Sequence, residues 1–299
     1  MISAKIIAHS VNPKGKEIAT FEWEYPRFIH GEVMTHRRFS RNAASSRAIP
    51  AKKIREQVWN RPAMPIHWGA NQSGMQAESS LSGLKKSFAK RLWKAGAKLS
   101  CIIHAGMEKV GLHKQICNRI LEPWMLMKVV VTSTEWANFL WLRDHDAAQP
   151  EIQQLAKLTA DELLNSIPRS LGWGEWHLPY ITDAHRELGM DLQKAISISC
   201  CAQVSYRALD DSVAKAYKLT GMLLRGDRVH ASPFEHLAKA VDSSKHPSAL
   251  EAKRIGFTHI DVEGDYWSGN LCEWVQHRQL LDGHDVVDLH QYISEKKAA

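Results

Sequence analysis

Thr35-His36-Arg37-Arg38-Phe39-Ser40-Arg41-Asn42-Ala43-Ala44-Ser45-Ser46-Arg47 is the stretch on which the interpretation of this chain depends. It holds four arginines, a histidine, three serines and an asparagine within thirteen residues. Guanidinium and hydroxyl groups are costly to bury without partners, and planar guanidinium forks match the oxygens of a phosphate. The stretch therefore predicts a nucleotide or phosphate pocket. Composition alone leaves a second interpretation open, a solvated basic loop.

The remaining composition is that of an ordinary globular protein. The chain has 299 residues, of which 44% are hydrophobic and 24% charged, enough for one large domain or two small ones. We expect a cytoplasmic protein, since no apolar run reaches the roughly 20 residues of a membrane span and the N-terminus does not resemble a signal peptide. The five cysteines are odd in number and form no C-x-x-C pair, which favours reduced thiols and argues against a metal site.

The net charge of +7 is concentrated near the opening stretch. Residues 1–60 hold 11 Lys and Arg against 5 Asp and Glu, a difference of +6. A localised positive field suits a small anionic ligand, whereas a groove for duplex DNA would recruit basic residues from the whole chain. We therefore expect a nucleotide partner and neither a nucleic acid nor a membrane.

Hydrophobic periodicity predicts an α+β fold, with helices flanking a small antiparallel sheet in one compact domain over residues 1–299. Turn signals and proline positions separate the elements. The predicted strands are 2–9, 18–25 and 124–134. The predicted helical segments are 28–34, a helix from 84 with lysines on its outer face, 114–121, a helix from 135 that Pro150 kinks or divides, 192–202, and a helix that Asp210-Asp211 opens and that runs through Leu224; segments 66–82 and 168–182 are expected to be irregular.

Spacing within the opening stretch resembles the signature of the flavin-dependent thymidylate synthases. The pattern His-Arg-x-x-Ser-x-Asn-x-x-Ser-x-Arg begins at His36 and ends at Arg47. The resemblance implies that His36 and Arg37 hold FAD, that Ser45 contacts the substrate phosphate or ring edge, and that Arg47 clamps the phosphate. Glu32, where the family often has glutamine, is expected at the substrate.

A second motif runs from Arg119 in Arg-Ile-Leu-Glu-Pro to Asn-Phe-Leu-Trp-Leu-Arg at 138–143 and Ala-Gln-Pro-Glu at 148–151. It resembles the later half of the family. By resemblance, Arg119 assists with the phosphate and Asn138 touches the flavin. Arg143 bonds the pyrimidine and stabilises negative charge on its ring, which makes Arg143 and Ser45 the candidate catalytic residues. On a helix, Asn138 and Arg143 lie about 140° apart and face different parts of a ligand. Taken singly, each arginine could instead pair within its own helix.

A third motif, His230-Ala-Ser-Pro-Phe-Glu-His236, is preceded by Cys201-Ala-Gln-Val-Ser-Tyr206. It resembles the family's His-x-Thr-Pro-Phe-Glu-His and Ala-x-Val-Ser-Phe segments. The resemblance implies that His230 and Ser232 lie against the flavin. The alternative is a turn with histidines on the surface.

The order of the motifs differs from the family's usual order. The third motif normally precedes the arginine-rich signature, whereas here it follows it by almost 200 residues. We therefore expect a phage-type, circularly permuted chain, in which 1–165 is the usual second half and 190–285 the usual first half. A partial echo at 273–278, Glu-Trp-Val-Gln-His-Arg, fits a trimmed tandem duplication.

Several family residues are replaced. Thr35 stands at a usual arginine, Ala43 at a glutamate, Ala48 at a tyrosine and Ala147 at a histidine. Arg38, Arg41 and Arg278 are the candidates to replace the arginine missing at position 35.

The resemblance implies a flavoenzyme that adds one carbon to carbon 5 of a pyrimidine deoxynucleotide monophosphate, with dUMP to dTMP as the leading reaction. FAD is the implied cofactor, NADPH and methylenetetrahydrofolate are the implied cosubstrates, and a homotetramer is the implied assembly. Two alternatives stay open: hydroxymethylation of dUMP or dCMP, and a non-catalytic nucleotide-binding protein.

Overall fold

The structure is a computed structural model that describes residues 2–205, 208–225, 229–246, 248–285, 288–290 and 293–294. Tyr206, the last residue of the quoted Cys201–Tyr206 segment, lies outside them. The chain forms two compact units. The first comprises Met1–His9, Ala19–Ile167 and Val204–Ala208, and the second Ser10–Ile18, Pro168–Gln203 and Leu209–Ala299.

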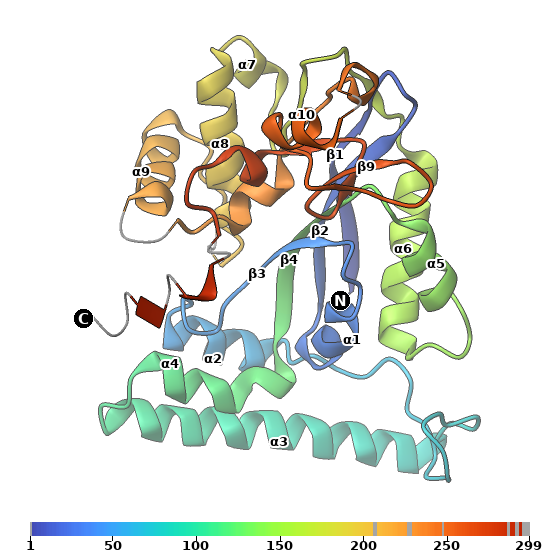
Figure 1. The fold of residues 1–299 in the computed structure, drawn as a ribbon. Coiled ribbons are helices and arrows are strands. Elements are labelled where there is room, and N and C mark those ends of the chain that lie inside the picture. Colours follow the sequence, from blue (N-terminus) through green and yellow to red (C-terminus); the bar gives the residue numbers. More distant parts are fainter. Residues whose placement is uncertain are drawn as a thin grey trace. The chain divides into compact units, whose positions relative to one another are not determined.

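The first unit contains a sheet with helices around it (Figure 1). Its strands lie in the order β3-β4-β2-β1, with β4 antiparallel to both β2 and β3. The short β5 adds to the far end of β1 in parallel, through residues of the second unit. The elements are β1 (Ser3–Val11), β2 (Glu17–Pro26), η1 (Arg27–Ile29), α1 (His30–Met34), β3 (Ser40–Ala43), α2 (Ala51–Asn60), α3 (Gly83–Lys109), α4 (Lys114–Cys117), η2 (Asn118–Trp124), β4 (Leu126–Ser133), α5 (Ala137–Arg143) and α6 (Pro150–Asn165).

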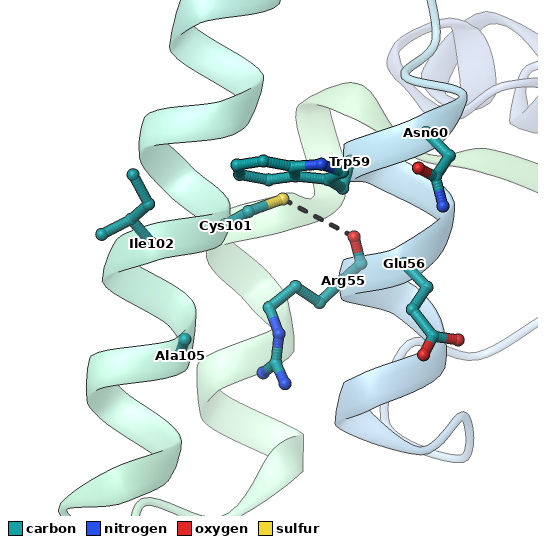
Figure 2. Close-up of a pocket in the computed structure, with 7 residues that line it drawn as sticks. All are labelled: Arg55, Glu56, Trp59, Asn60, Cys101, Ile102 and Ala105. Carbon is teal, nitrogen blue, oxygen red and sulfur yellow. Dashed lines mark hydrogen bonds between the residues drawn. The ribbon is translucent and has the colours of Figure 1, made fainter.

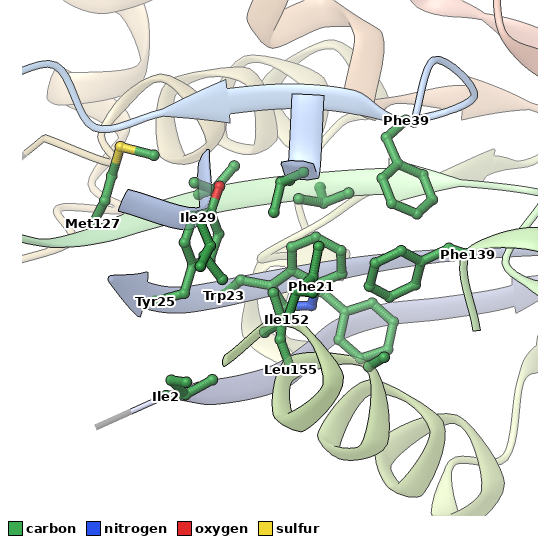
Figure 3. Close-up of a cluster of buried hydrophobic side chains, with 14 of the residues drawn as sticks. Ile2, Phe21, Trp23, Tyr25, Ile29, Phe39, Met127, Phe139, Ile152 and Leu155 are labelled. Atoms are coloured by element: carbon green, nitrogen blue, oxygen red, sulfur yellow. The ribbon is translucent and has the colours of Figure 1, made fainter. Parts of the chain in front are cut away.

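The core of this unit is rich in aromatic side chains, and β2 supplies three of them (Figure 3). Phe21, Trp23 and Tyr25 alternate along β2 and are all fully buried, as the period of two predicts. The ring of Trp23 stacks on Phe139 of α5 with centroids 5.4 Å apart. Ile152 and Leu155 of α6 close the same cluster, so α5 and α6 cover this face of the sheet.

A second core of the first unit holds α2, α3 and η2 together. Ile54 and Val58 of α2 pack with Ala97 and Cys101 of α3 and with Leu121 of η2. Helix α3 is confirmed where the spacing predicted it, but its exposed face differs from the expectation. Lysines were expected to form the outer face, yet Leu84, Phe88 and Leu92 are 90%, 62% and 57% exposed.

Of the two prolines expected to bound helices, Pro150 explains where a helix begins, whereas Pro123 lies inside a 3₁₀ helix. Pro150 divides the predicted long helix, because it is the first residue of α6, where its fixed φ is favourable and its missing N–H is not needed. The predicted helix 114–121 is shorter: α4 ends at Cys117, and a 3₁₀ helix, η2, continues to Trp124 and includes Pro123.

The second unit is built from short strands and helices. It has two three-stranded sheets, ordered β10-β9-β8 and β11-β7-β6, and the helices α8 and α9 pack against each other. The mixed α+β class predicted from the sequence is confirmed. The elements are β5 (Arg169–Ser170), β6 (Trp176–His177), α7 (Asp183–Arg186), α8 (Met190–Ala202), α9 (Val213–Leu224), η3 (Ser232–His236), β7 (Ala238–Lys239), η4 (Ser243–Lys245), α10 (Ala249–Arg254), β8 (His259–Ile260), β9 (Tyr266–Ser268), β10 (Leu271–Cys272), β11 (Val275–Gln276) and η5 (His277–Leu280).

Candidate functional site

The arginine-rich stretch forms a turn followed by an edge strand. The N–H groups of Thr35 and His36 donate to the carbonyls of Glu32 and Val33, which ends α1 in a tight turn. Strand β3 then pairs antiparallel with β4. Alternation along β3 buries Ser40 and Asn42 and leaves Arg41 half-buried. The strand therefore separates the polar side chains of the motif onto two faces.

Arg143, at the end of α5, lies against the start of the stretch. Its Nε donates to Nε2 of His36 over 2.9 Å, and its Nη2 donates to Oγ1 of Thr35 over 3.1 Å. The Thr35 hydroxyl in turn donates to the carbonyl oxygen of Glu32 over 2.7 Å. The guanidinium expected at the pyrimidine is thus fixed by two residues of the signature.

His36 is held in its neutral form by its surroundings. The residue is 8% exposed, and its ring packs edge-on to Phe139, with centroids 5.0 Å apart. Burial, and then the charges of Arg143 and Arg41, lower the pKa of His36 to about 4. Because Arg143 can only donate, Nε2 of His36 accepts and the ring proton is on Nδ1.

Arg41 reinforces the same turn from its other side. Its Nη1 donates to the carbonyl oxygens of Val33 and His36 over 3.2 and 3.0 Å. It therefore lies close to the position at which the family arginine is replaced by Thr35. Arg143, which was not among the candidates for that replacement, contacts Thr35 directly.

The second half of the signature is a loop tied down by buried polar groups. The N–H of Ser45 donates to Oγ of Ser205 over 2.9 Å, and Oγ of Ser46 donates to Glu122 over 2.6 Å. Nδ2 of the fully buried Asn118 donates to the carbonyls of Ser46 and Ile49 over 2.7 and 3.1 Å. The guanidinium-bearing Arg47 is exposed at the tip of this loop.

Glu122 is the shared ion-pair partner of two arginines, Arg119 of its own segment and Arg27 of η1. Arg119 donates to its Oε1 over 2.8 Å, and Nε of Arg27 lies 3.2 Å from its Oε2. Burial acts to raise the pKa of Glu122, but the hydrogen bond from Ser46 and the charges of Arg27 and Arg119 outweigh it, so the pKa is lowered. In this structure Arg119 therefore pairs within its own segment, the second interpretation left open by the sequence.

The other predicted site residues divide between the two units. Arg37 and Asn138 are exposed and Glu32 is half-buried, all in the first unit. His230 and Ser232 are exposed in the second unit, at the start of η3. The structure thus brings together His36, Thr35 and Arg143, and separately Ser45, Ser46 and Glu122.

In the second unit, the third motif lies beside the closing echo. Strand β11, which carries the echo, pairs antiparallel with β7 directly after the motif. Arg278 of the echo forms an ion pair with Glu235 of the motif, and its Nη2 donates to the carbonyl of His284 over 3.1 Å.

Sequence reasoning missed the residues that position the motif. Asn118 directly precedes Arg119, Glu122 follows Arg119 by three residues within the second motif, and Ser205 lies within the quoted Cys201–Tyr206 segment. For Asn118 and Glu122 the available signal was their position beside Arg119, and for Ser205 it was the Val204-Ser205 pair of the quoted segment. No sequence pattern indicated a role for Arg27, because a lone arginine after a strand is common.

The family model described as thymidylate synthase complementing protein (Thy1) matches residues 16–169, just over half of the chain. No curated protein matches it. Similar solved structures include the UMP/dUMP methylase PolB from Streptomyces cacaoi bound with 5-Br dUMP, 14% identical over 55% of this chain and 90% of that one, with a TM-score of 0.45. Another is Thymidylate Synthase X (ThyX) from Helicobacter pylori with FAD and dUMP, 16% identical over 49% and 67%, with a TM-score of 0.35.

The matched segment contains the whole arginine-rich stretch together with Arg119, Asn138 and Arg143. No helix among the described residues is both long enough and apolar enough to cross a membrane. The resemblance stated from the motifs is confirmed: this chain belongs to the thymidylate synthase complementing protein family, the flavin-dependent thymidylate synthase-like enzymes that modify carbon 5 of pyrimidine nucleotides.

Proposed function

We propose that this protein binds a pyrimidine deoxynucleotide monophosphate and transfers one carbon from methylenetetrahydrofolate to carbon 5 of its ring, converting dUMP to dTMP. The observation that carries the proposal is the bond from Arg143 to His36, which joins two motifs more than 100 residues apart. Arg143 is held by two neutral groups, the ring of His36 and the hydroxyl of Thr35. Among the residues that the structure describes, no carboxylate forms an ion pair with Arg143, so its positive charge suits negative charge that develops on a pyrimidine ring.

The proposed roles follow from exposure and charge. Arg143 stabilises negative charge that develops on the pyrimidine, as a fixed donor in place before the reaction. Arg47, exposed at the loop tip, binds the phosphate, with the Ser45 hydroxyl beside it. Arg119 stays on Glu122 and adds to the positive field at longer range. Glu32, half-buried, contacts the substrate.

FAD fits the remaining polar residues of the first unit. Arg37 and Asn138 expose their polar groups, as residues that hold an external cofactor must, and His36 anchors the turn that presents Arg37. His230 and Ser232 are proposed as further flavin contacts. When bound and reduced by NADPH, the flavin supplies the hydride that completes the methyl group.

The motif order supports a circular permutation, which we also propose, with 1–165 and 190–285 as the exchanged halves. In the usual family order, the run that leads into the His-Arg of the signature follows the third motif. Here β11, which carries the partial echo of that run, pairs with β7 directly after the third motif, and this pairing supports the permutation. A homotetramer is proposed on the family resemblance.

Hydroxymethylation of dUMP or dCMP is the second candidate. It is favoured by the surroundings of Ala147, whose carbonyl accepts a bond from Gln76, so that the irregular 66–82 segment contacts the backbone at the position of the family histidine. Binding without catalysis is the third candidate.

The first experiment is a visible absorbance spectrum of the purified protein before and after anaerobic NADPH. A flavin spectrum that bleaches is expected. Incubation with methylenetetrahydrofolate and either dUMP or dCMP then separates the products by mass, since the hydroxymethyl product carries one more oxygen. A colourless protein that takes up no added FAD would remove the enzyme proposal and leave nucleotide binding.

A matched pair of variants tests the assignment of Arg143. Arg143→Gln removes the charge and is expected to lower kcat/KM by about 100-fold, the usual effect of losing one preorganised donor. Lys52→Gln removes a charge that is 78% exposed on α2 and is expected to leave kcat/KM unchanged. Equal activity of the two variants would refute the role.

A further inference from the structure

One buried amide holds the turn that carries Arg47. The turn spans residues 46–48, and the carbonyl oxygens of Ser46 and Ile49 lie on either side of its tip. Both accept hydrogen bonds from Nδ2 of Asn118, over 2.7 and 3.1 Å. Because the two hydrogens of a single NH2 group satisfy both carbonyls, Asn118 fixes the distance across the turn. The shape of the turn therefore depends on where this amide lies and which way it points.

The direction of Arg47 depends on that turn. Arg47 is exposed, and among the residues that the structure describes no side chain forms a hydrogen bond or an ion pair with its guanidinium. A long side chain without partners takes its direction from the backbone that carries it. A merely solvated arginine would need no fixed backbone, since water could satisfy the carbonyls of its turn. An arginine that meets a phosphate gains from one, because its orientation is then set before the ligand arrives.

His104 determines which way the amide of Asn118 points, and both residues are fully buried. Nδ1 of the ring accepts from Nη1 of Arg55 over 3.1 Å. Because a guanidinium can only donate, the ring proton is on Nε2, which donates to Oδ1 of Asn118 over 3.0 Å. If the amide rotated by half a turn, its oxygen would face the two carbonyls and its NH2 group would face the ring N–H. That rotation is therefore unfavourable at both ends.

Arg55 connects this network to the packing of α2 against α3. Its side chain extends from α2 toward α3 (Figure 2), and its guanidinium forms an ion pair with Glu108. The thiol of Cys101 on α3 donates to the carbonyl oxygen of Arg55 over 3.7 Å (Figure 2). The donors therefore run in one direction, from Arg55 through His104 to Asn118 and the turn. A buried network whose ring and amide groups are all satisfied has one arrangement, which keeps the turn rigid.

We propose that Asn118 is a positioning residue for phosphate recognition, and that His104 and Arg55 hold its amide in the orientation that keeps Arg47 at the exposed tip. Because the phosphate is assigned to Arg47 under the proposed function, this role of Asn118 rests on that function. Asn118 and His104 are fully buried, so they act through the turn and not on the ligand itself. The network should therefore affect the binding of a nucleotide and leave the binding of its nucleoside unchanged.

Asn118→Asp tests the network with little change in side-chain shape. A carboxylate cannot donate to the two carbonyls, so the Kd for dUMP is expected to rise about ten-fold, the effect of one lost charge-assisted hydrogen bond. The Kd for deoxyuridine, which has no phosphate, is expected to stay the same. NMR titration measures both, since it also follows weak binding. An equal rise for the two ligands, or none for dUMP, would overturn the proposal.

Thr159→Val is the matched control. It removes another fully buried hydrogen bond of the first unit, from Oγ1 to the carbonyl of Leu155, and keeps the shape of the side chain. Both dissociation constants are expected to stay at their wild-type values. If Thr159→Val weakened dUMP binding as much as Asn118→Asp does, loss of stability and not the turn would explain the effect, and the proposal would be wrong.

A pair of variants at His104 separates the network from the fold. Glutamine places an N–H group near the position of Nε2 and keeps the donor to Asn118, whereas asparagine is too short to reach it. We expect His104→Asn to raise the Kd for dUMP several-fold and His104→Gln to keep it within about two-fold of the wild-type value. A His104→Gln variant that binds dUMP as weakly as His104→Asn would contradict the role of His104.

Coupling to Arg47 gives the sharpest test. If Asn118 acts through Arg47, Asn118→Asp should not change the Kd for dUMP further once Arg47→Gln has removed the guanidinium. Additive effects of the two substitutions would show that Asn118 acts elsewhere, which would overturn this inference and leave the proposed function intact. A wild-type protein that does not bind dUMP at all would remove the proposed function and the role of Asn118 together.

Discussion

Arg143 donates from Nε to Nε2 of His36 over 2.9 Å, and this bond, together with the one to Thr35, orients the guanidinium that the proposed reaction requires. His36 can accept only while its ring is neutral. Burial and the nearby arginines keep its pKa at about 4, so the bond persists across the physiological range. Arg143 is in place before a substrate arrives, which lowers the cost of orienting it.

Thr35 should contribute to nucleotide affinity through Arg143. Thr35→Val removes the hydroxyl that accepts from Nη2 and keeps the shape of the side chain. One hydrogen bond at an exposed site contributes about 1 kcal/mol, so the Kd for dUMP is expected to rise about five-fold. Isothermal titration measures it. Thr35→Ser keeps the hydroxyl and should restore wild-type affinity; a weakened Ser variant would show that the methyl group, not the bond, is what counts.

His36 should make the protein less stable in mild acid. Its pKa is about 4 in the folded protein and 6.5 in the unfolded chain, so the unfolded state takes up the proton first. The stability contribution is complete above pH 6.5 and falls as pH drops toward 4, by about 3 kcal/mol in all. Urea unfolding at pH 7 and pH 5 measures the loss. His36→Gln should flatten this dependence in part, because His236 and His277 are also lowered, to about 3 and 4. An unchanged slope would contradict the assignment.

Glu122 should be needed to hold the signature loop. Glu122→Ala leaves Arg27 and Ser46 without their acceptor in a partly buried site. We expect a loss of about 1–3 kcal/mol in the free energy of unfolding, measured by urea denaturation. Arg119→Ala removes a half-exposed partner of the same carboxylate and should cost less than about 1 kcal/mol. Equal losses would mean that Arg119, rather than Ser46 or Arg27, is the important partner.

Phe139 should be the most sensitive residue of α5. It is 1% exposed and touches both Trp23 and His36. Phe139→Ala is expected to cost about 3–5 kcal/mol in the free energy of unfolding, the usual loss for a buried aromatic. Thermal denaturation measures it. Trp141 of the same helix is 76% exposed, so Trp141→Ala should change the free energy of unfolding by no more than about 0.5 kcal/mol. Comparable losses would place α5 differently against the sheet.

Much of the fold could be predicted from local sequence patterns. The alternation of Phe21, Trp23 and Tyr25 predicted one buried face of β2, because side chains of a strand alternate whatever it packs against. Pro150 marked a helix boundary for an equally local reason. The signature could be recognised for the same reason, since its residues lie within thirteen positions.

The face of α3 shows where such reasoning ends. Periodicity predicted the helix and the stripe of Leu84, Phe88 and Leu92, but a stripe does not say what it faces. Ala97, Ser100, Cys101 and His104 lie on the buried side instead, where α2 and η2 pack. Small residues there allow close helix packing, a signal weaker than hydrophobicity.

The sequence by itself determined the family, the elements of the signature and the types of group available to bind an anion. Only the tertiary structure decided their partners. Arg143 donates a hydrogen bond to Thr35, which is 108 positions away in the sequence, and Ser46 donates one to Glu122, which is 76 positions away. Every arginine of the motifs has the same charge and the same planar guanidinium group. The packing of α5 and η2 against the sheet selects which carboxylate, hydroxyl or ring nitrogen each one reaches, and no local pattern records that choice.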